Sequence, residues 1–492
     1  MHGTRNDAHA PPLRARLLLL GPLLFLAVLF LPQPPGLGSA GHATLAVTTW
    51  MAAWWLTVAV ALPVTALLPL ALFPILGIAD PETTAAPYAN PIIFLFLGGF
   101  LLAAAIERWG LHRRLALGVI ARTGTGPRRV VAGFMVVTAF ISMWVSNTAT
   151  AAMMLPIAVA VLKLAEERPG ASEFGTALML GIAYAASIGG VATLVGTPPN
   201  AIFAANAGEL AGRPVGFAEW MLVGLPLSVV MLAIAWATLC LLKSRLPRGP
   251  LPRMAEALAR QRAAMGPWSA GERGTAIVFA LTALAWIWRQ PKALGPVTVP
   301  GIQSLLPAVG DATIAMAAAT VLFLTPVRTD SGRAPLLDWE HARQIPWGIL
   351  LLFGGGLTLA RQFEETGLTT WLAGHLAALK GLTPILLVAI VAILFIFLTE
   401  LTSNTATAAL AMPVMASVAA ATGSPALSLM AAAALASSLA FMLPVGTPPN
   451  AIVFASGYIR SSEMARAGIW LNVASAAAVT VTMATLFGWV FE

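Results

Sequence analysis

The chain has 492 residues, of which 58% are hydrophobic and only 10% are charged, and its mean hydropathy is +0.84. Because a soluble domain carries about 25% charged residues, this composition excludes a soluble protein and indicates a polytopic membrane protein. Apolar runs of about 20 residues, long enough to cross a membrane as a helix, recur along the chain, and no run of alternating ten-residue strands predicts a barrel. We therefore expect an all-α protein of the plasma membrane, which in a bacterium is the inner membrane.

The net charge of +8 does not indicate a nucleic-acid partner. The basic residues lie in short connections between apolar runs, where the positive-inside rule places them on the cytoplasmic side. The single cysteine, Cys240, excludes an intramolecular disulfide or a cysteine-based metal site. The six histidines are scattered without paired ligand spacing, which argues against zinc or another transition metal.

The first apolar run covers residues 17–31 and follows a polar segment with three arginines. This pattern fits a cleaved secretory signal or a retained first helix. We favour the retained helix, because multispanning proteins seldom need a cleaved signal. The next run, residues 45–77, is too long for one span, and Pro63 predicts two helices joined by a tight turn. Asp80 and Glu82 then predict an outside loop.

A span over residues 91–106 contains the pair Gly98-Gly99 and leads into a strongly basic connection that we place in the cytoplasm. Polar residues interrupt the following apolar run, residues 130–162, at its middle, and both of its ends look cytoplasmic. This combination predicts a re-entrant helical hairpin that enters from the inside. In the next span, residues 176–206, consecutive prolines at 198–199 cannot continue the helical hydrogen bonds, so the helix must unwind.

A span over residues 220–242 leads to a second basic connection, also inside. Within it, residues 253–265 predict a short amphipathic helix at the cytoplasmic interface. Two further spans are expected over residues 275–287 and 312–323. Several tryptophans, including Trp109 and Trp220, fall near expected span ends, where indole is favoured at the membrane interface.

The second half repeats this order. A span over residues 345–360 contains Gly354-Gly355, and an outside loop with Glu364, Glu365 and His375 follows. The second hairpin, residues 384–418, would enter from outside, the second broken helix covers residues 427–456, and residues 469–491 form the last span. The total is about eleven transmembrane helices, two re-entrant hairpins and two broken helices, with the N-terminus inside and the C-terminus outside. Four segments result: scaffold helices (1–90), a first inverted repeat (91–243), a connection (244–344) and a second inverted repeat (345–492).

The clearest evidence for this repeat is a pair of motifs that each occur twice. Ser-Asn-Thr-Ala-Thr-Ala-Ala begins at Ser146 and again at Ser403, and Gly-Thr-Pro-Pro-Asn-Ala-Ile begins at Gly196 and again at Gly446. Four of the eight asparagines of the chain lie in these motifs: Asn147, Asn200, Asn404 and Asn450. Because an amide at membrane depth is costly without partners, this concentration predicts a polar cavity. The alternative is that these side chains only cap broken helices or join spans.

A hairpin tip and an unwound helix both leave free backbone groups at membrane depth. Carbonyl oxygens, together with Ser, Thr and Asn side chains, suit a small alkali cation, whereas the amides of helix N-termini suit an anion. The motifs contain no basic residue. One site could therefore hold an anion and cations together without a buried lysine or arginine.

This duplicated pair of motifs resembles the divalent anion/sodium symporter family, whose members transport dicarboxylates, citrate or sulfate, and the resemblance extends from about residue 91 to residue 491. It implies an inverted-repeat transporter, usually a homodimer in the membrane lipid, in which a mobile domain with both hairpins moves like an elevator against a fixed scaffold. Sodium would be the coupling ion, at two or more sites. Matching motifs imply a first sodium site from Ser142, Ser146, Asn147 and Gly196, and a second from Thr399, Thr402, Asn404 and Gly446. They imply substrate contacts from Asn147, Thr148, Thr197, Asn404, Thr405 and Thr447.

The leading hypothesis is sodium-coupled import of a C4 dicarboxylate, and the residues do not distinguish among dicarboxylates, citrate and sulfate. A sodium-independent exchanger of the same fold is the nearest alternative. A cation/proton antiporter would commonly need a buried titrating carboxylate, and the motif segments offer only Glu400, which either plays a coupling role or pairs with a buried donor. An enzyme is disfavoured, because no nucleophile with a base, paired carboxylates or metal-ligand spacing occurs at membrane depth.

Overall fold

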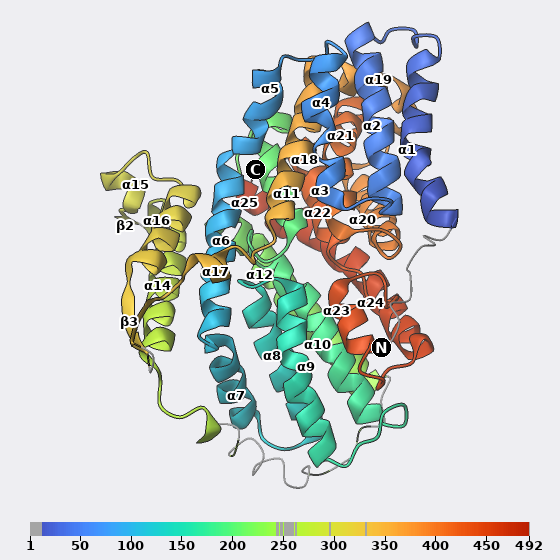
Figure 1. Cartoon of the computed structure of the whole chain (residues 1–492). Coiled ribbons are helices and arrows are strands. Elements are labelled where there is room, and N and C mark those ends of the chain that lie inside the picture. Colours follow the sequence, from blue (N-terminus) through green and yellow to red (C-terminus); the bar gives the residue numbers. More distant parts are fainter. Residues whose placement is uncertain are drawn as a thin grey trace, which may run out of the picture.

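The computed structural model describes residues 12–242, 263–294, 297–329 and 332–491, together with residues 246, 249 and 260. These residues form mostly helices, with two short β-hairpins (Figure 1). Most of the amphipathic helix predicted over residues 253–265 lies outside the described residues.

The N-terminal part forms short and long helices that pack beside the second half of the chain. The predicted first helix is present as α1, and its neighbour α2 ends at Thr57, before the turn that leads to Pro63. Val58 takes a left-handed backbone conformation there, with φ 50°. Asp80 caps the helix that follows, because its carboxylate accepts a hydrogen bond from the Thr83 amide at 2.8 Å. The elements are α1 (Pro12–Phe30), α2 (Ser39–Thr57), α3 (Leu62–Thr65), α4 (Leu68–Ile75), α5 (Pro81–Ala85) and the 3₁₀ turn η1 (Ala86–Ala89).

The first half then contains one helical hairpin and one broken helix. The hairpin consists of α8 and α9, which are separated by four non-helical residues before Asn147. The unwinding predicted at prolines 198–199 is confirmed, since α10 ends at Val191 and α11 begins at Pro198. The elements are α6 (Pro91–Arg108), α7 (Leu111–Thr123), α8 (Pro127–Ser142), α9 (Asn147–Leu164), α10 (Glu173–Val191), α11 (Pro198–Leu210), α12 (Phe217–Ala237) and the π turn η2 (Thr238–Leu242).

Two helices and two β-hairpins connect the halves. The strands are antiparallel, with Lys292 opposite Val299 in the first hairpin and Pro326 opposite Pro335 in the second. The elements are α14 (Ala270–Ile287), β1 (Lys292–Leu294), β2 (Val297–Val299), α15 (Ile302–Leu305), α16 (Asp311–Leu324), β3 (Pro326–Thr329), β4 (Gly332–Pro335) and α17 (Trp339–Ala342). Helices α14 and α16 stand beside α6, at the left of Figure 1.

The second half repeats the hairpin and the broken helix. Its hairpin is formed by α20 and α21, and ten non-helical residues, 438–447, separate α22 from α23. The α8–α9 hairpin lies in the lower half of Figure 1, whereas α20 and α21 lie in the upper half. The elements are α18 (Trp347–Glu365), α19 (Leu368–His375), the 3₁₀ turn η3 (Ala377–Leu379), α20 (Pro384–Thr399), α21 (Asn404–Thr422), α22 (Ala426–Ser437), α23 (Pro448–Phe454), α24 (Ser461–Thr482), the π turn η4 (Met483–Phe487) and α25 (Gly488–Phe491).

Several connections differ from the sequence-based expectation. Helix α7 lies inside the first basic connection, and α19 occupies the loop expected around His375. The last helix begins at Ser461 instead of residue 469. Its first turns are helical but contain the charged residues Glu463 and Arg466, so the apolar pattern does not include them. Hydropathy locates the apolar part of a helix and misses polar turns that extend it beyond the membrane. The β-hairpins were not predicted either, because strands of three or four residues are too short to show a periodic pattern.

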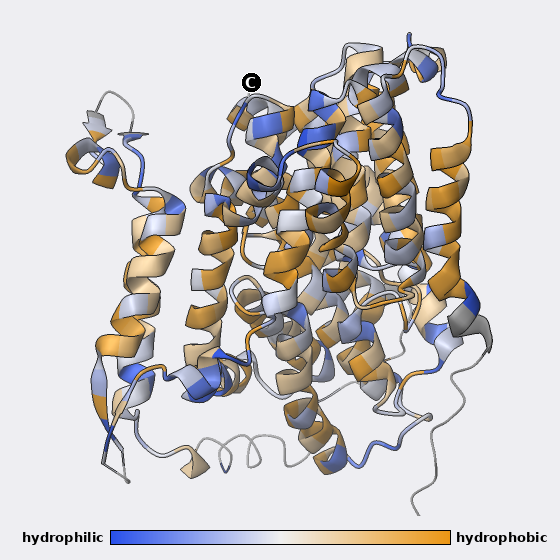
Figure 2. Ribbon diagram, turned by 45° about the horizontal axis from the view of Figure 1, so that its top comes forward, coloured by the Kyte–Doolittle hydropathy of each residue, from blue (hydrophilic) through white to orange (hydrophobic). Residues whose placement is uncertain are grey.

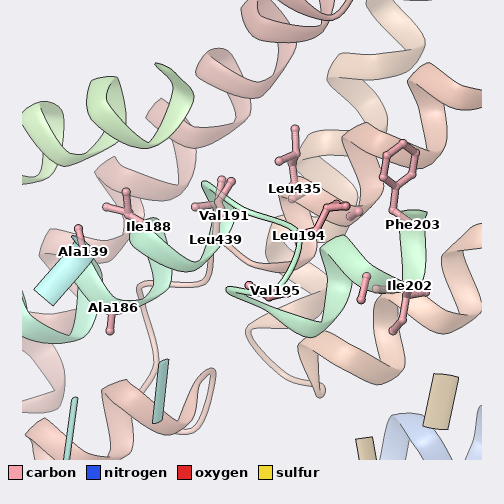
Figure 3. Packing of buried hydrophobic residues seen from close by; sticks show 14 of the residues in the cluster. Ala139, Ala186, Ile188, Val191, Leu194, Val195, Ile202, Phe203, Leu435 and Leu439 are labelled. Carbon is pink, nitrogen blue, oxygen red and sulfur yellow. The ribbon is translucent and has the colours of Figure 1, made fainter. Parts of the chain in front are cut away.

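The core around the two breaks is made of small and branched apolar residues. Helices α8 and α10 approach so closely that a β-carbon at Gly189 would overlap the backbone of Ala139. Figure 3 shows Val191 and Leu194, at the first break, in the same cluster as Leu435 and Leu439, at the second. This packing brings the two unwound segments together in the interior.

By length and composition, six helices in the described part of the chain can cross a membrane. They are Pro81–Arg108, Asn147–Leu164, Glu173–Val191, Phe217–Leu241, Asn404–Thr422 and Ser461–Phe491. Five further apolar helices are 10–17 residues long, among them Pro384–Thr399 and Ala426–Ser437, which belong to the second hairpin and the second broken helix. Apolar residues dominate the body of the molecule in Figure 2. The chain is thus a polytopic helical membrane protein.

Candidate transport site

Both repeated motifs line one internal cavity of about 460 Å³. All six residues expected to contact substrate lie on its wall: Asn147, Thr148, Thr197, Asn404, Thr405 and Thr447. Of the residues expected to bind sodium, Ser146, Asn147, Gly196, Thr402, Asn404 and Gly446 line the same cavity. Ser142 and Thr399 do not line it and are fully buried behind the hairpin tips.

Four helices begin at this cavity, namely α9, α11, α21 and α23. Their N-cap residues are Ser146, Thr197, Ser403 and Thr447, and all four line the wall. A helix N-terminus presents unpaired amides and roughly half a positive charge. None of the cavity-lining residues in the described part of the chain carries a charge. Any positive potential supplied by the lining of this cavity therefore comes from the backbone.

Behind the first hairpin tip, side-chain and carbonyl oxygens form a compact cluster. The amide nitrogen of Asn147 faces Ser142 Oγ at 2.8 Å, the Ala186 carbonyl at 3.1 Å and the Gly196 carbonyl at 3.2 Å. Ser142 Oγ donates to the same Ala186 carbonyl at 2.6 Å. A β-carbon at Gly190 would collide with the Asn147 amide, so the glycine is required for this close approach. The hairpin tip is thereby fixed to the end of α10.

The second half builds the same cluster from equivalent positions. Thr399 Oγ1 lies 2.7 Å from Asn404 Oδ1 and 3.0 Å from the carbonyl oxygen of Ser437. Thr399 and Asn404 correspond in the repeat to Ser142 and Asn147, whereas Ser437 corresponds to Ser187, the residue after Ala186. In addition, Thr402 Oγ1 donates to the Leu398 carbonyl at 2.8 Å and lies 2.7 Å from Thr407 Oγ1. Each half thus places a hydroxyl and an amide beside the carbonyl of a neighbouring helix.

The other two motif asparagines do not line the cavity, and for them the capping alternative is correct. Asn200 Nδ2 donates to the carbonyls of Gly190, Val191 and Thr193 at 2.8–3.2 Å. Asn450 Nδ2 donates to the Ala440 and Leu443 carbonyls at 3.3 and 3.0 Å. Both side chains are fully buried. They join the carbonyls of each unwound segment to the helix that follows it.

A side chain that sequence reasoning placed at the membrane interface supports the first break instead. Trp220 is fully buried, and its indole N–H donates to the Val191 carbonyl at 3.0 Å. Thr193 has a similar role, because its hydroxyl donates to the Met143 carbonyl at 2.5 Å and accepts from the Gly196 amide at 3.1 Å. Proximity to the end of a hydrophobic run does not distinguish an interfacial tryptophan from one that lies inside.

Glu400 supports the second break and is 3% exposed. One oxygen of its carboxylate accepts hydrogen bonds from the amides of Phe441 and Met442 at 2.7 and 2.8 Å, and the other accepts from the Leu443 amide at 3.0 Å. Asn472 of α24 donates a fourth hydrogen bond at 2.8 Å. The described residues contain no cation paired with it. The structure thus provides the buried donors that one of the two considered roles of Glu400 requires, and the coupling role stays a hypothesis.

The same carboxylate lies directly against the second site. A β-carbon at Gly446 would come within 2.7 Å of Glu400 Oε2, and Glu400 follows Thr399 in the chain. The equivalent position in the first half is Met143, which has no charge. The carboxyl group beside the second site therefore has no counterpart at the equivalent position of the first half.

The two halves are joined across the interior by Tyr184 of α10. This residue is fully buried, and its hydroxyl donates to the Phe441 carbonyl at 2.9 Å. Its ring also meets the Phe441 ring edge-on, with centroids 5.1 Å apart. A helix of the first half thus contacts the unwound segment of the second directly.

A second hollow of about 620 Å³ adjoins the cavity and shares Phe100, Ser146, Thr148 and Ile349 with it. Its other end is lined by Glu107, Arg108, His341 and Gln344. Arg108 pairs there with Asp338 at 2.9 Å. The hollow extends from the first hairpin tip toward the end of α6, where the basic connection begins.

Comparison with known proteins agrees with this architecture. Residues 14–491 match the family described as the sodium:sulfate symporter transmembrane region. The chain belongs to this family. The match extends over both repeats and the connection between them, so the whole membrane domain is accounted for.

Proteins of known name are similar over nearly the whole chain. A sodium-dependent dicarboxylate transporter, SdcS, of Staphylococcus saprophyticus is 41% identical over 473 residues, which cover 95% of this chain and 90% of that protein. The SdcS of Staphylococcus aureus is 41% identical over 466 residues, or 93% and 88% of the two chains. Among solved structures, the YdaH transporter of Alcanivorax borkumensis superposes with a TM-score of 0.55 at 16% identity, covering 84% of this chain and 90% of that one. This last similarity concerns the fold alone.

Replacing Glu400 tests whether it positions the second site. In Glu400→Gln, one carboxylate oxygen becomes an NH₂ group that faces N–H donors, which leaves buried groups unpaired at a cost of about 1–3 kcal/mol. We expect the sodium concentration for half-maximal uptake to rise about tenfold, while the KM for the carried anion at saturating sodium stays unchanged.

The matched control is Glu340→Gln, which removes an exposed carboxylate paired with Arg343 on the surface and should change neither value. Unchanged sodium dependence in Glu400→Gln, with a normal thermal midpoint, would contradict the positioning role.

Proposed function

We propose that this protein is a secondary active transporter that couples the import of a divalent anion to sodium, and that the anion is a C4 dicarboxylate. The observation that carries the proposal is the uncharged cavity in which both Ser-Asn-Thr tips and both Thr-Pro-Pro-Asn breaks meet. Family membership and the names of relatives that are 41% identical over almost the full length agree with it.

In this proposal the anion lies between the two hairpin tips. Its carboxylates would contact Asn147, Thr148 and Thr197 from the first half, and Asn404, Thr405 and Thr447 from the second. The N-termini of α9, α11 and α21 point toward the cavity, and each stabilises a nearby negative charge by about 0.3–1 kcal/mol, or up to about 2 kcal/mol when partly buried. A dianion with a carboxylate at each end matches a cavity that is lined by two hairpin tips.

Sodium would bind behind each tip, one ion in each oxygen cluster. The first site would use Ser142, Ser146, Asn147 and the carbonyl region of Gly196, and the second Thr399, Thr402, Asn404 and the region of Gly446. Neutral oxygens suit a hard alkali cation, and the Asn147 amide would turn its oxygen toward the ion in place of the nitrogen that faces the cluster here. Because the asparagines belong to both the ion and the anion sites, each ligand orients a side chain that the other needs, which is a direct basis for coupling.

We further propose that transport follows an elevator-type alternating-access mechanism within a homodimer. About eleven transmembrane helices, including the retained helix over residues 17–31, and two re-entrant hairpins would place the N-terminus inside and the C-terminus outside. The hollow beside the first tip leads toward the basic connection, so this conformation would open to the cytoplasm. The mobile domain would carry both hairpins past the fixed helices.

Uptake into proteoliposomes tests the coupling. We expect an inward sodium gradient to drive labelled succinate uptake well above the equilibrium level, because each substrate would enter together with sodium. Replacing sodium by choline should abolish the signal, and excess unlabelled malate should compete at least tenfold better than sulfate or citrate. Rapid succinate counterflow in sodium-free vesicles would instead identify an exchanger.

Removing a tip amide tests the anion site. Asn147→Ala or Asn404→Ala should reduce uptake at least a hundredfold without loss of folded protein, because each loses a ligand shared by anion and ion. The control is Asn206→Ala, since Asn206 is buried but donates only within α11, to the Ile202 carbonyl at 2.7 Å. Wild-type uptake in either tip variant would overturn the site assignment.

The repeat itself offers a test of the second sodium site. Thr399→Ser installs the residue that Ser142 provides in the first half, so it should retain sodium-dependent uptake within about threefold. Thr399→Val keeps the shape of threonine but removes the oxygen, and it should raise the sodium requirement more than tenfold. Equal sodium curves for the two variants, measured at saturating succinate, would show that this hydroxyl does not serve the ion.

A further inference from the structure

One end of the molecule carries a basic helix that the transport site does not use. Helix α7 follows the membrane-crossing α6 directly, and the segment from residue 111 to residue 129 contains five arginines and no acidic residue. Among the described residues, only Arg114 of these five has an acidic partner within salt-bridge distance. The helix therefore presents uncompensated positive charge where a membrane-spanning helix ends.

A cleft of about 600 Å³ separates α7 from the chain that leads into α14. One wall is a single face of α7 with Arg114, Leu115, Gly118 and Arg122, and the other wall includes Trp268. Arg114 is held in place, since it contacts Glu272 at 2.6 Å and its guanidinium carbon lies 5.3 Å from the centre of the Trp268 ring. Arg122 is exposed and donates from Nη1 to the Gly118 carbonyl at 2.9 Å.

The cleft adjoins a shallow, mainly apolar groove of about 20 Å³ beside the first hairpin. Leu115 lines both hollows, and the groove is otherwise formed by His112 and by apolar side chains of α6, α7, α8 and α14 and of the hairpin tip. Phe140 in this groove is 46% exposed, and Val145 immediately precedes Ser146 at the tip. Polar and apolar parts thus follow one another in the order of a lipid molecule, with arginines at the interface and hydrocarbon toward the membrane interior.

We propose that the cleft and the groove together bind one anionic phospholipid. Its phosphate would lie beside Arg122, and one acyl chain would run along Leu115 and Phe140 toward the hairpin tip, whereas Arg114 is occupied by Glu272 and by the carbonyls of residues 265–267 and shapes the wall. Anionic lipid is the negatively charged partner that the surroundings of this surface supply, and a basic residue near it contributes about 1 kcal/mol. Trp268, 41% exposed, has the amphipathic character favoured at the level of the headgroups.

This site would connect the membrane to the transport site. The acyl chain would pack against the end of α8, whose last residue, Ser142, belongs to the first oxygen cluster. Bound lipid would therefore restrict movement of the hairpin tip from its outer side. The inference does not depend on which anion the protein carries.

Lipid titration of the purified, detergent-solubilised full chain tests this inference. We expect phosphatidylglycerol to raise the thermal midpoint in a saturable manner, and phosphatidylcholine or inorganic phosphate at the same concentration to leave it unchanged. Arg122→Gln should weaken the apparent affinity for phosphatidylglycerol about fivefold, since about 1 kcal/mol of attraction is lost. The matched control is Arg113→Gln, which removes the same charge from an exposed position on α7 outside the cleft.

A second variant tests the cleft without changing charge. A β-carbon at Gly118 meets only Arg122 Nη1, at 3.6 Å, so the phenyl group of Gly118→Phe can enter the cleft while the helix remains intact. This variant should keep the lipid-free midpoint and lose the response to phosphatidylglycerol. Equal stabilisation by phosphatidylcholine, an equal response to inorganic phosphate, an equal loss in Arg113→Gln, or a normal response in Gly118→Phe would each overturn the proposal.

Discussion

A helix that is interrupted inside a membrane leaves backbone amides and carbonyls without partners, and each such group costs several kcal/mol in hydrocarbon. This chain interrupts its helices in four places and directs the free groups into one cavity. Buried side chains pair with many of the rest, with Asn200 and Asn450 serving the carbonyls of the two unwound segments. The segments are fixed by these bonds, so the hairpin tips can present their own polar groups to a ligand.

The two halves solve this problem with different chemistry. In the first, neutral donors, Trp220 and Thr193, hold the unwound segment. In the second half, the carboxylate of Glu400 accepts hydrogen bonds from three consecutive backbone amides. This carboxyl group has no counterpart beside the first oxygen cluster, where the equivalent residue is Met143. A repeat that is symmetric in its sequence motifs therefore has two sites with different surroundings.

The duplicated motifs predicted the cavity, because polar residues that recur at equivalent positions of a repeat indicate a shared structural or binding role. All six expected substrate residues line that cavity. The supporting residues were missed or misplaced, since Trp220 and Tyr184 act through contacts with distant segments that composition cannot indicate. Two of the four motif asparagines turned out to support the backbone, because sequence shows that an amide is buried but not which way it faces. Helix α7 escaped detection, because its 13 residues are too few for a membrane span and its three arginines mark the segment as a basic connection.

The hydroxyl of Tyr184 links α10 to the second unwound segment by a hydrogen bond to the Phe441 carbonyl. This contact is buried and links the two halves directly, so a displacement of one half at this point would strain its packing against the other. In the proposed mechanism, the two walls of the cavity would therefore move together as one body. The spacing between the walls would then be kept during movement, and the length of the carried anion would be tested in the same way on both sides of the membrane.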